Sequence, residues 1–341
     1  GRGEAAQMQV RNKAGERPVG RDVSQLEPTQ ALTADAAGPS YYDVPLLKEP
    51  VWVGAVPLYF FIGGAAGAAS TLSCMARLFG GPDLDGLARR ARLLGAAGDT
   101  VGAGLLIYDL GRPTRFLNML RVFNPRSPMS VGSWVLSASG AANTGALLLQ
   151  NRRGFLGGVG ELLNVVGGVL GMPLAGYTAV LLSNTAVPVW RQARRSLPLL
   201  YMASGVAAAG SILSLSARSE RERRVVERYA VAGKVGELAA IAALHREVGR
   251  ESRVARPLAR GLSGALLTTA TVLTAASLAS SLLPGSRRRA RGAAVAGILG
   301  SLALRFAMHY AGKASARDPH ASFAPQRRRT TQGMVARASE T

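Results

Sequence analysis

The feature that most constrains this chain is a series of long apolar stretches without a single charged residue. Four of them span residues 53–76, 127–151, 196–217 and 261–286. The hydrocarbon core of a bilayer is about 30 Å thick, and about 20 apolar residues in a helix cross it. Because backbone polar groups in lipid need partners within their own segment, each stretch predicts a membrane-spanning helix.

Four further apolar stretches contain isolated charged residues. They are 93–110 with Asp99 inside and Asp109 at its edge, 154–190 with Glu161, 229–245 with Lys234 and Glu237, and 292–312 with Arg305. The sequence therefore predicts an all-α integral membrane protein, a bundle of eight transmembrane helices within residues 41–312. Residues 1–40 and 313–341 are polar and lack hydrophobic periodicity, so we expect them to be disordered tails.

The charge distribution excludes a soluble nucleic-acid-binding protein. Lys and Arg number 41 against 20 Asp and Glu, a formal net charge of +21, but the basic residues cluster between the apolar stretches. Loops of multi-pass membrane proteins carry charge in this way. Lys and Arg number 15 in the loops opposite the termini and 12 in the loops on the terminal side, which weakly favours termini outside the cytoplasm.

Few residues are available to hold a redox cofactor. The single cysteine, Cys74, excludes an intramolecular disulfide and a cysteine-ligated iron–sulfur cluster or zinc site within this chain. Three histidines are too few for two bis-histidine haems, although His245 and His309 leave a single haem formally open. We predict no metal site.

The longest polar interruption, residues 109–130, alternates arginines with large apolar residues. Its arginines are Arg112, Arg115, Arg121 and Arg126, and Phe116 to Leu120 and Phe123 lie between them. This pattern is typical of an amphipathic segment at the membrane surface.

Several motifs resemble the NrfD family of membrane subunits. They read YYDVPLLKEPVW at 41–52, PLYFFIGGAAG at 57–67, DLGRP at 109–113 leading to SPMSVGSW at 127–134, and AGYTAVLLS at 175–183. The motifs occur in the family's order, and the resemblance covers about residues 41–195.

The resemblance implies a cofactor-free anchor of eight helices in the cell (inner) membrane that exchanges electrons with a quinone, either menaquinone or ubiquinone. It implies a ferredoxin-like iron–sulfur subunit as partner and a molybdopterin-dependent catalytic subunit beyond it. The chain itself would then hold no haem or iron–sulfur cluster, contact membrane lipid and bind no nucleic acid.

The resemblance also implies which residues line the quinone pocket. Tyr59 and Tyr177 match pocket positions, although Tyr59 stands where family anchors have a histidine, and a phenol is a poorer proton acceptor near pH 7. Asp109 and Arg112 lie in the most specific motif. They either form a scaffolding pair or take part in proton transfer.

Ionisable residues inside membrane helices are functional candidates by default. Asp99 and Glu161 are the candidate catalytic residues for proton transfer. Lys234 with Glu237, and Arg305 with His309, share helix faces, as part of a proton path or as a self-neutralising pair and a snorkelling arginine. An alternative function is a transporter or ion-translocating module that uses such carboxylates as coupling sites.

Overall fold

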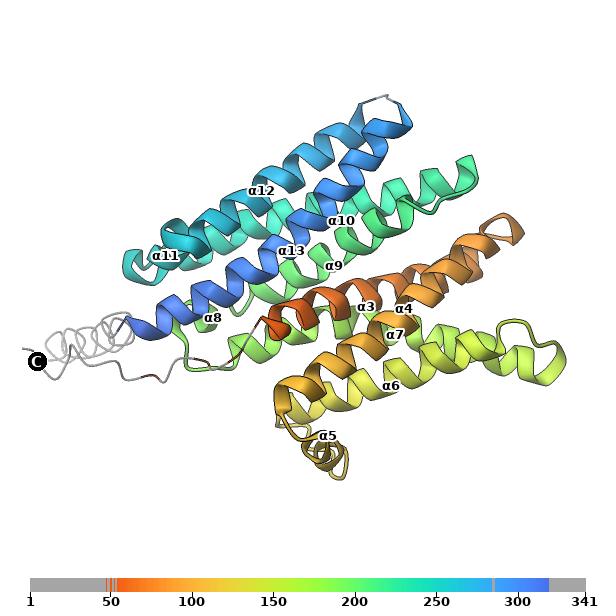
Figure 1. Cartoon of the computed structure of the whole chain (residues 1–341), viewed down its shortest axis with the longest axis horizontal. Helices are drawn as coiled ribbons and strands as arrows, with labels where there is room; N and C mark the ends of the chain where they lie inside the picture. Colours follow the sequence, from red (N-terminus) through yellow and green to blue (C-terminus); the bar gives the residue numbers. More distant parts are fainter. Residues whose placement is uncertain (1–46, 48–49, 51, 53, 284–285, 319–341) are drawn as a thin grey trace, which may run out of the picture. The chain divides into compact units, whose positions relative to one another are not determined.

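The structure is a computed structural model that describes residues 47, 50, 52, 54–283 and 286–318. Within these residues every regular element is a helix (Figure 1). The eight long helices are α3 (Ala55–Phe79), α4 (Asp85–Leu110), α6 (Pro128–Leu149), α7 (Gly154–Ser183), α9 (Ser196–Ser214), α10 (Glu220–Val248), α12 (Gly261–Leu282) and α13 (Arg287–Arg317).

The long helices form two groups of four. Helices α3, α4, α6 and α7 pack together as a first bundle, and α9, α10, α12 and α13 pack as a second. Helices α3 and α7 of the first bundle contact α9 of the second, and α3 also contacts α13. The family-like motifs 57–67, 109–113, 127–134 and 175–183 lie in or beside the helices of the first bundle, and most of the motif 41–52 lies outside the described residues.

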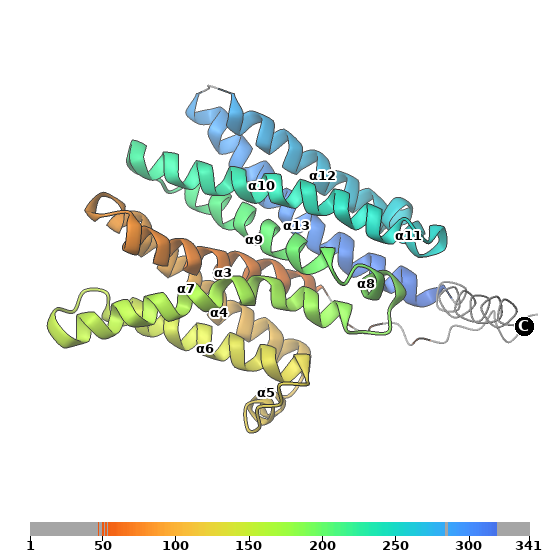
Figure 2. The same ribbon diagram turned by 180° about the vertical axis from the view of Figure 1, so that it is seen from behind.

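Short helices gather at one end of the bundles, which we call the α5 end. Helices α5 (Pro113–Met119), α8 (Pro188–Gln192) and α11 (Ser252–Ala259) lie there (Figure 2); α8 and α11 contact α13, and α5 contacts α4 and α6. The connections α3–α4, α6–α7, α9–α10 and α12–α13 lie at the opposite end, which we call the loop end. Helix α5, with mostly exposed side chains, falls within the predicted surface segment 109–130.

Glycines bring the helices of the first bundle into close contact. A Cβ added to Gly67 of α3 would lie 2.2 Å from the carbonyl oxygen of Gly171 in α7, and one added to Gly98 of α4 would lie 2.6 Å from Ala66 Cβ. Backbones approach this closely only where no side chain intervenes. The small-residue spacing in the sequence therefore marks real helix contacts.

Six of the eight predicted spans coincide with helices long and apolar enough to cross a membrane: α3, α4 with the turn before it, α7, α9, α12 and α13. Helix α6 is uncharged but rich in Ser, Gly, Asn and Thr, and α10 carries charges, so neither reaches the same mean hydropathy. The apolar stretch 154–190 is not one helix, because α7 ends at Ser183 and α8 begins at Pro188. Helix α13 runs past residue 312 to Arg317; the remainder of both expected tails lies outside the described residues.

Polar contacts join the two bundles at the loop end. Arg90 of α4 lies 2.6 Å from Glu222 in the first turn of α10, and Arg221 pairs with Asp83. Burial alone would raise the pKa of Glu222, but hydrogen bonds from Arg90 and from the backbone N–H groups of Arg218 and Ser219 lower it below its ordinary value. Glu222 therefore serves both as the partner of Arg90 and as part of the α10 capping box.

Candidate functional site

Three of the candidate residues meet inside the first bundle. Tyr59 lies in the second turn of α3, Asp99 in the middle of α4 and Tyr177 two turns before the end of α7. The Tyr59 ring contacts α4 at Gly102, one turn from Asp99, and α3 also packs against α7, which carries Tyr177. Tyr59 and Asp99 are almost completely buried.

The carboxylate of Asp99 is held by α6 on one side only. Its Oδ2 accepts hydrogen bonds from Ser139 Oγ at 3.0 Å and from Asn143 Nδ2 at 2.7 Å. Its Oδ1 is buried and has no hydrogen-bond partner within the described residues. A buried acceptor without a partner costs about 1–3 kcal/mol, so Oδ1 would gain from binding a proton, a water or a ligand.

Glycines also shape the space around the two tyrosines. A Cβ added to Gly132 of α6 would overlap the Tyr177 ring, and one added to Gly102 of α4 would lie 3.4 Å from the Tyr59 ring. Gly102 is one turn from Asp99 on the same helix. A side chain at position 132 would therefore displace the Tyr177 ring, whereas a methyl group at position 102 would only touch the Tyr59 ring.

Asp109 and Arg112 lie apart from this group and from each other. Asp109 is in the last turn of α4, about 15 Å along the helix axis from Asp99, and Arg112 is exposed in front of α5. No ion pair within 4.0 Å joins Asp109 to Arg112 in this fully described segment. The ion pair that would make Asp109 and Arg112 a scaffold is therefore absent. Both residues lie at the α5 end of the first bundle.

Glu161 lies near the start of α7, towards the loop end. It forms an ion pair with Arg77 at 2.9 Å and lies 3.8 Å from Arg92. Its side chain is 42% exposed within the protein, so it is not the isolated buried carboxylate that the sequence indicated. The structure therefore does not bring Glu161 and Asp99 together.

Polar residues that the sequence did not single out occupy the space between Glu161 and Asp99. Arg92 is 4% exposed, and its Nε donates to Asn164 Oδ1 at 3.3 Å. Asn143, the partner of Asp99, packs on Gly167, one turn along α7 from Asn164. The asparagines are uncharged and do not interrupt the apolar stretches, and Arg92 directly precedes the stretch 93–110, so the sequence pattern does not single them out.

Comparison with known proteins identifies the family. The family model "Polysulphide reductase, NrfD" matches residues 46–315, most of the sequence. The chain belongs to the NrfD family. It is therefore a multi-pass membrane protein, and the resemblance seen in residues 41–195 extends through the second bundle.

One curated relative of this NrfD protein is the C subunit of the polysulfide reductase of Wolinella succinogenes. The two are 28% identical over 193 residues, which are 48% of this protein. The matched part spans 57% of the relative's length. No solved structure matches the protein significantly.

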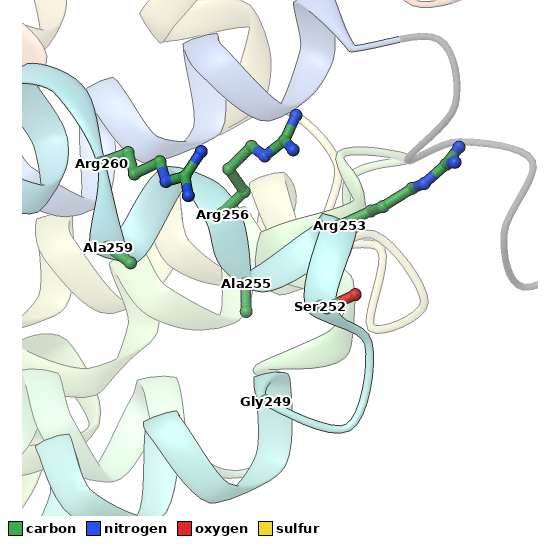
Figure 3. A pocket seen from close by; sticks show the side chains of 7 residues that line it. All are labelled: Gly249, Ser252, Arg253, Ala255, Arg256, Ala259 and Arg260. Atoms are coloured by element: carbon green, nitrogen blue, oxygen red, sulfur yellow. The ribbon is translucent and has the colours of Figure 1, made fainter.

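An open pocket of this NrfD protein lies at the α5 end of the second bundle. It has a volume of about 430 Å³ and is lined by residues 249–260 around α11, including Arg253, Arg256 and Arg260. The three arginine side chains extend from α11 without meeting one another (Figure 3). This lining suits an anion better than a quinone head group. Tyr59, Asp99 and Tyr177 do not contribute to it.

Proposed function

We propose that this protein is the quinone-reactive membrane subunit of a multisubunit oxidoreductase. The observation that carries the proposal is the convergence of Tyr59, Tyr177 and Asp99 inside the first bundle. Two phenolic hydroxyls can donate hydrogen bonds to a quinone, and a neighbouring carboxyl can exchange protons with it. Membership of the NrfD family and the relative's printed name support a redox role.

The reaction requires two electrons and two protons, which convert a quinone into a quinol or the reverse. Within the described residues no group of His, Cys, Asp and Glu is arranged to hold a metal ion. We therefore place the electron donor or acceptor in a partner, a ferredoxin-like iron–sulfur subunit docked at the α5 end. A molybdopterin-dependent subunit would complete the enzyme.

The protons would pass through Asp99. Its unpartnered Oδ1 can take up a proton while Ser139 and Asn143 hold Oδ2. Arg92, Asn164 and Glu161 extend a series of polar groups from there towards the loop end. This arrangement favours proton exchange with the side of the membrane opposite the electron-transfer partner.

All eight long helices would cross the inner cell membrane. Helices α6 and α10 lie alongside the six apolar helices and have the length of a span, although their hydropathy is lower. The packing of α6 on α4 and α7, and of α10 on α9 and α12, supports this placement. The start of α3, the end of α13 and the partner would then share the α5 side, and the loop charges weakly favour a position outside the cytoplasm for that side.

The test is quinol-analogue oxidation by the whole complex carrying Tyr177→Phe. The change removes one hydroxyl and keeps the ring, so we expect the bundle to stay intact. Loss of a hydrogen bond to a neutral carbonyl costs about 0.5–1.5 kcal/mol, so the rate or affinity should fall by up to about tenfold. Tyr59→Phe should act similarly.

Tyr108→Phe is the matched control, because Tyr108 lies on α4 near the same end but is 74% exposed. It should leave the kinetics unchanged. Unchanged quinol kinetics and inhibitor affinity in both Tyr177→Phe and Tyr59→Phe would contradict the proposed site.

A further inference from the structure

The second bundle contains its own set of buried ionisable side chains. Lys234 and Glu237 on α10 and Arg305 on α13 are each at most 2% exposed. Within the described residues, none of these three side chains forms a hydrogen bond or ion pair with Tyr59, Asp99 or Tyr177. Charged residues inside membrane proteins are expensive, and three in one bundle call for a function.

Each charged group is bound mainly by neutral partners. Lys234 Nζ donates to Ser281 Oγ at 2.9 Å, and the two oxygens of Glu237 accept from Thr274 Oγ1 at 2.7 Å and Ser301 Oγ at 3.1 Å. Although Lys234 and Glu237 share a helix face, no ion pair within 4.0 Å joins them in this described part of the protein. The self-neutralising pair considered from the sequence does not form.

Arg305 is the residue of the three that lies nearest the first bundle. Its Nη2 donates to the carbonyl oxygen of Tyr201 at 2.8 Å, and its guanidinium carbon lies 3.8 Å from the centre of the Tyr201 ring. A Cβ added to Gly64 of α3 would lie 3.1 Å from Nη2. Arg305 therefore reaches the helix that carries Tyr59.

The polar groups follow one another along the bundle. Lys234 and Ser281 lie nearest the loop end, because Ser281 is in the last turn of α12. Glu237 follows one turn along α10, and Arg305 follows Ser301 one turn along α13. The order from the loop end inwards is thus lysine, glutamate, arginine.

Hydroxyl groups and hydrogen-bond donors without partners lie around Lys234, Glu237 and Arg305. Gly297 of α13 faces Ser211 Oγ, Ser277 Oγ and the Lys234 side chain. Ser211 Oγ, Ser204 Oγ and two nitrogens of Arg305 are buried without a hydrogen-bond partner among the described residues. A polar interior with unfilled hydrogen-bonding capacity is where bound water is expected, and water with hydroxyl groups conducts protons.

The charges allow one exchangeable proton. Arg305 stays charged at all accessible pH values. With Glu237 ionised and Lys234 neutral the cluster has no net charge, and one added proton makes it +1. That proton can reside on Lys234, leaving Glu237 ionised, or on Glu237, leaving Lys234 neutral; a second added proton would make the cluster +2 in an apolar environment.

We propose that Lys234 and Glu237 form a one-proton relay in the second bundle, distinct from the quinone site. A proton enters from the loop end and binds the neutral amine of Lys234. It then passes through hydroxyl groups or water to a carboxylate oxygen of Glu237, which restores the neutral lysine. Glu237 then releases the proton to water beside Ser204 and Arg305, which restores its carboxylate and the starting charges, so the second bundle moves one proton in each cycle.

The groups that face Glu237 are few. Its own helix contributes Lys234, α13 contributes Arg305, and α9 contributes Tyr201 through its contact with Arg305. Helix α12 contributes the hydroxyl of Thr274. Lys234 is influenced in addition by Glu227 on α10. Lys234 lies one turn from Glu237 on the same helix and Arg305 lies beyond Ser301, so Glu237 stands between two basic side chains.

The first experiment measures proton movement by the whole complex in liposomes during quinol-analogue oxidation. It rests on the proposed function, because quinol must drive the turnover. Glu237→Gln and Lys234→Met should retain turnover within about twofold and lose the relay's proton, about one of the protons moved per quinol, while the two that pass through Asp99 remain. Glu220→Gln, the same change at an exposed position of α10, should keep both values. Unchanged proton movement in both relay variants would overturn the proposal.

The second experiment does not depend on quinone. Infrared spectra of the intact complex during a pH titration should show the carbonyl band of a protonated carboxylic acid, and Glu237→Gln should remove one component of it. Thr274→Val keeps every charge and removes one hydrogen bond to Glu237, so it should shift the midpoint of that component. Thr268→Val is its control, because Thr268 Oγ1 bonds only to Gly264 of its own helix. A spectrum unaffected by Glu237→Gln would overturn the relay, whereas failure of quinol to react with the wild-type complex would overturn only the proposed function.

Discussion

At the scale of single residues, the environment of each carboxylate decides its role. Asp99 is buried and half satisfied, with one oxygen bound by Ser139 and Asn143 and the other free of partners among the described residues. Glu161 is partly exposed and paired with Arg77. In the sequence the two are equivalent candidates, because each is a single acid in an apolar stretch. Only tertiary contacts distinguish Asp99, a buried carboxylate with one free oxygen, from Glu161, a partly exposed one.

Asp99→Asn should lower quinol turnover by the whole complex by at least about tenfold, since positioned proton transfer contributes about 10²–10⁴-fold. The amide keeps the shape of the carboxylate and cannot carry a proton. The yield of assembled complex should fall less than the turnover. Rates per assembled complex, with the exposed Asp83→Asn as control, make the comparison.

Glu161→Gln should lower the same turnover by a smaller factor, because the Glu161 side chain is partly exposed and solvent can substitute for it at that end of the path. Equal turnover in wild type, Asp99→Asn and Glu161→Gln would mean that both acids are structural.

At the scale of helices, glycine contacts hold the first bundle together. The sequence has small residues four positions apart on these helices, Gly63 and Gly67 on α3 and Gly167 and Gly171 on α7, and in the structure Gly67 meets Gly171. It also placed the six apolar helices correctly. It failed at 184–187, where apolar and small residues form a turn that hydropathy does not distinguish from a helix, and for Lys234 and Glu237, whose partners come from α12 and α13.

Gly67→Ala should destabilise the protein by about 1–3 kcal/mol, because the new methyl group meets the α7 backbone and the helices must separate. The melting temperature of the detergent-solubilised protein, followed by helical circular dichroism, measures the effect. Gly104→Ala on α4 is the control, since no described residue comes within 4 Å of its added Cβ. Alanine there should be neutral or stabilise by up to about 1 kcal/mol. Equal melting temperatures for the two variants would show that α3 and α7 do not pack as described.

At the scale of the whole molecule, each bundle contains its own set of candidate functional residues. The first holds Tyr59, Tyr177 and Asp99, and the second holds Lys234, Glu237 and Arg305. The sequence predicted an all-α membrane protein of the NrfD family, and the family match confirms that assignment. The sequence could not predict that the helices group into two bundles with separate functional residues, because helix hydropathy carries no information about which helices are neighbours.

Reporter fusions test the arrangement of the molecule in the membrane. A reporter at residue 318 and one in the segment 111–127 should fall on the same side, and reporters at 81 and 151 on the opposite side. A reporter enzyme that is active only outside the cytoplasm assigns the sides, and we expect the α5 end outside. Reporters at 318 and 81 on one side would contradict a molecule with eight spans.

The most direct test of the central claim is photoaffinity labelling of the intact complex in membranes with a photoreactive quinone analogue. Mass spectrometry of the peptides then locates the label. The account predicts label near the start of α3, the second half of α4 and the second half of α7, lost on addition of excess unmodified quinone and reduced by Tyr177→Phe. Competed label confined to the second bundle, or no competed label in this protein, would contradict it.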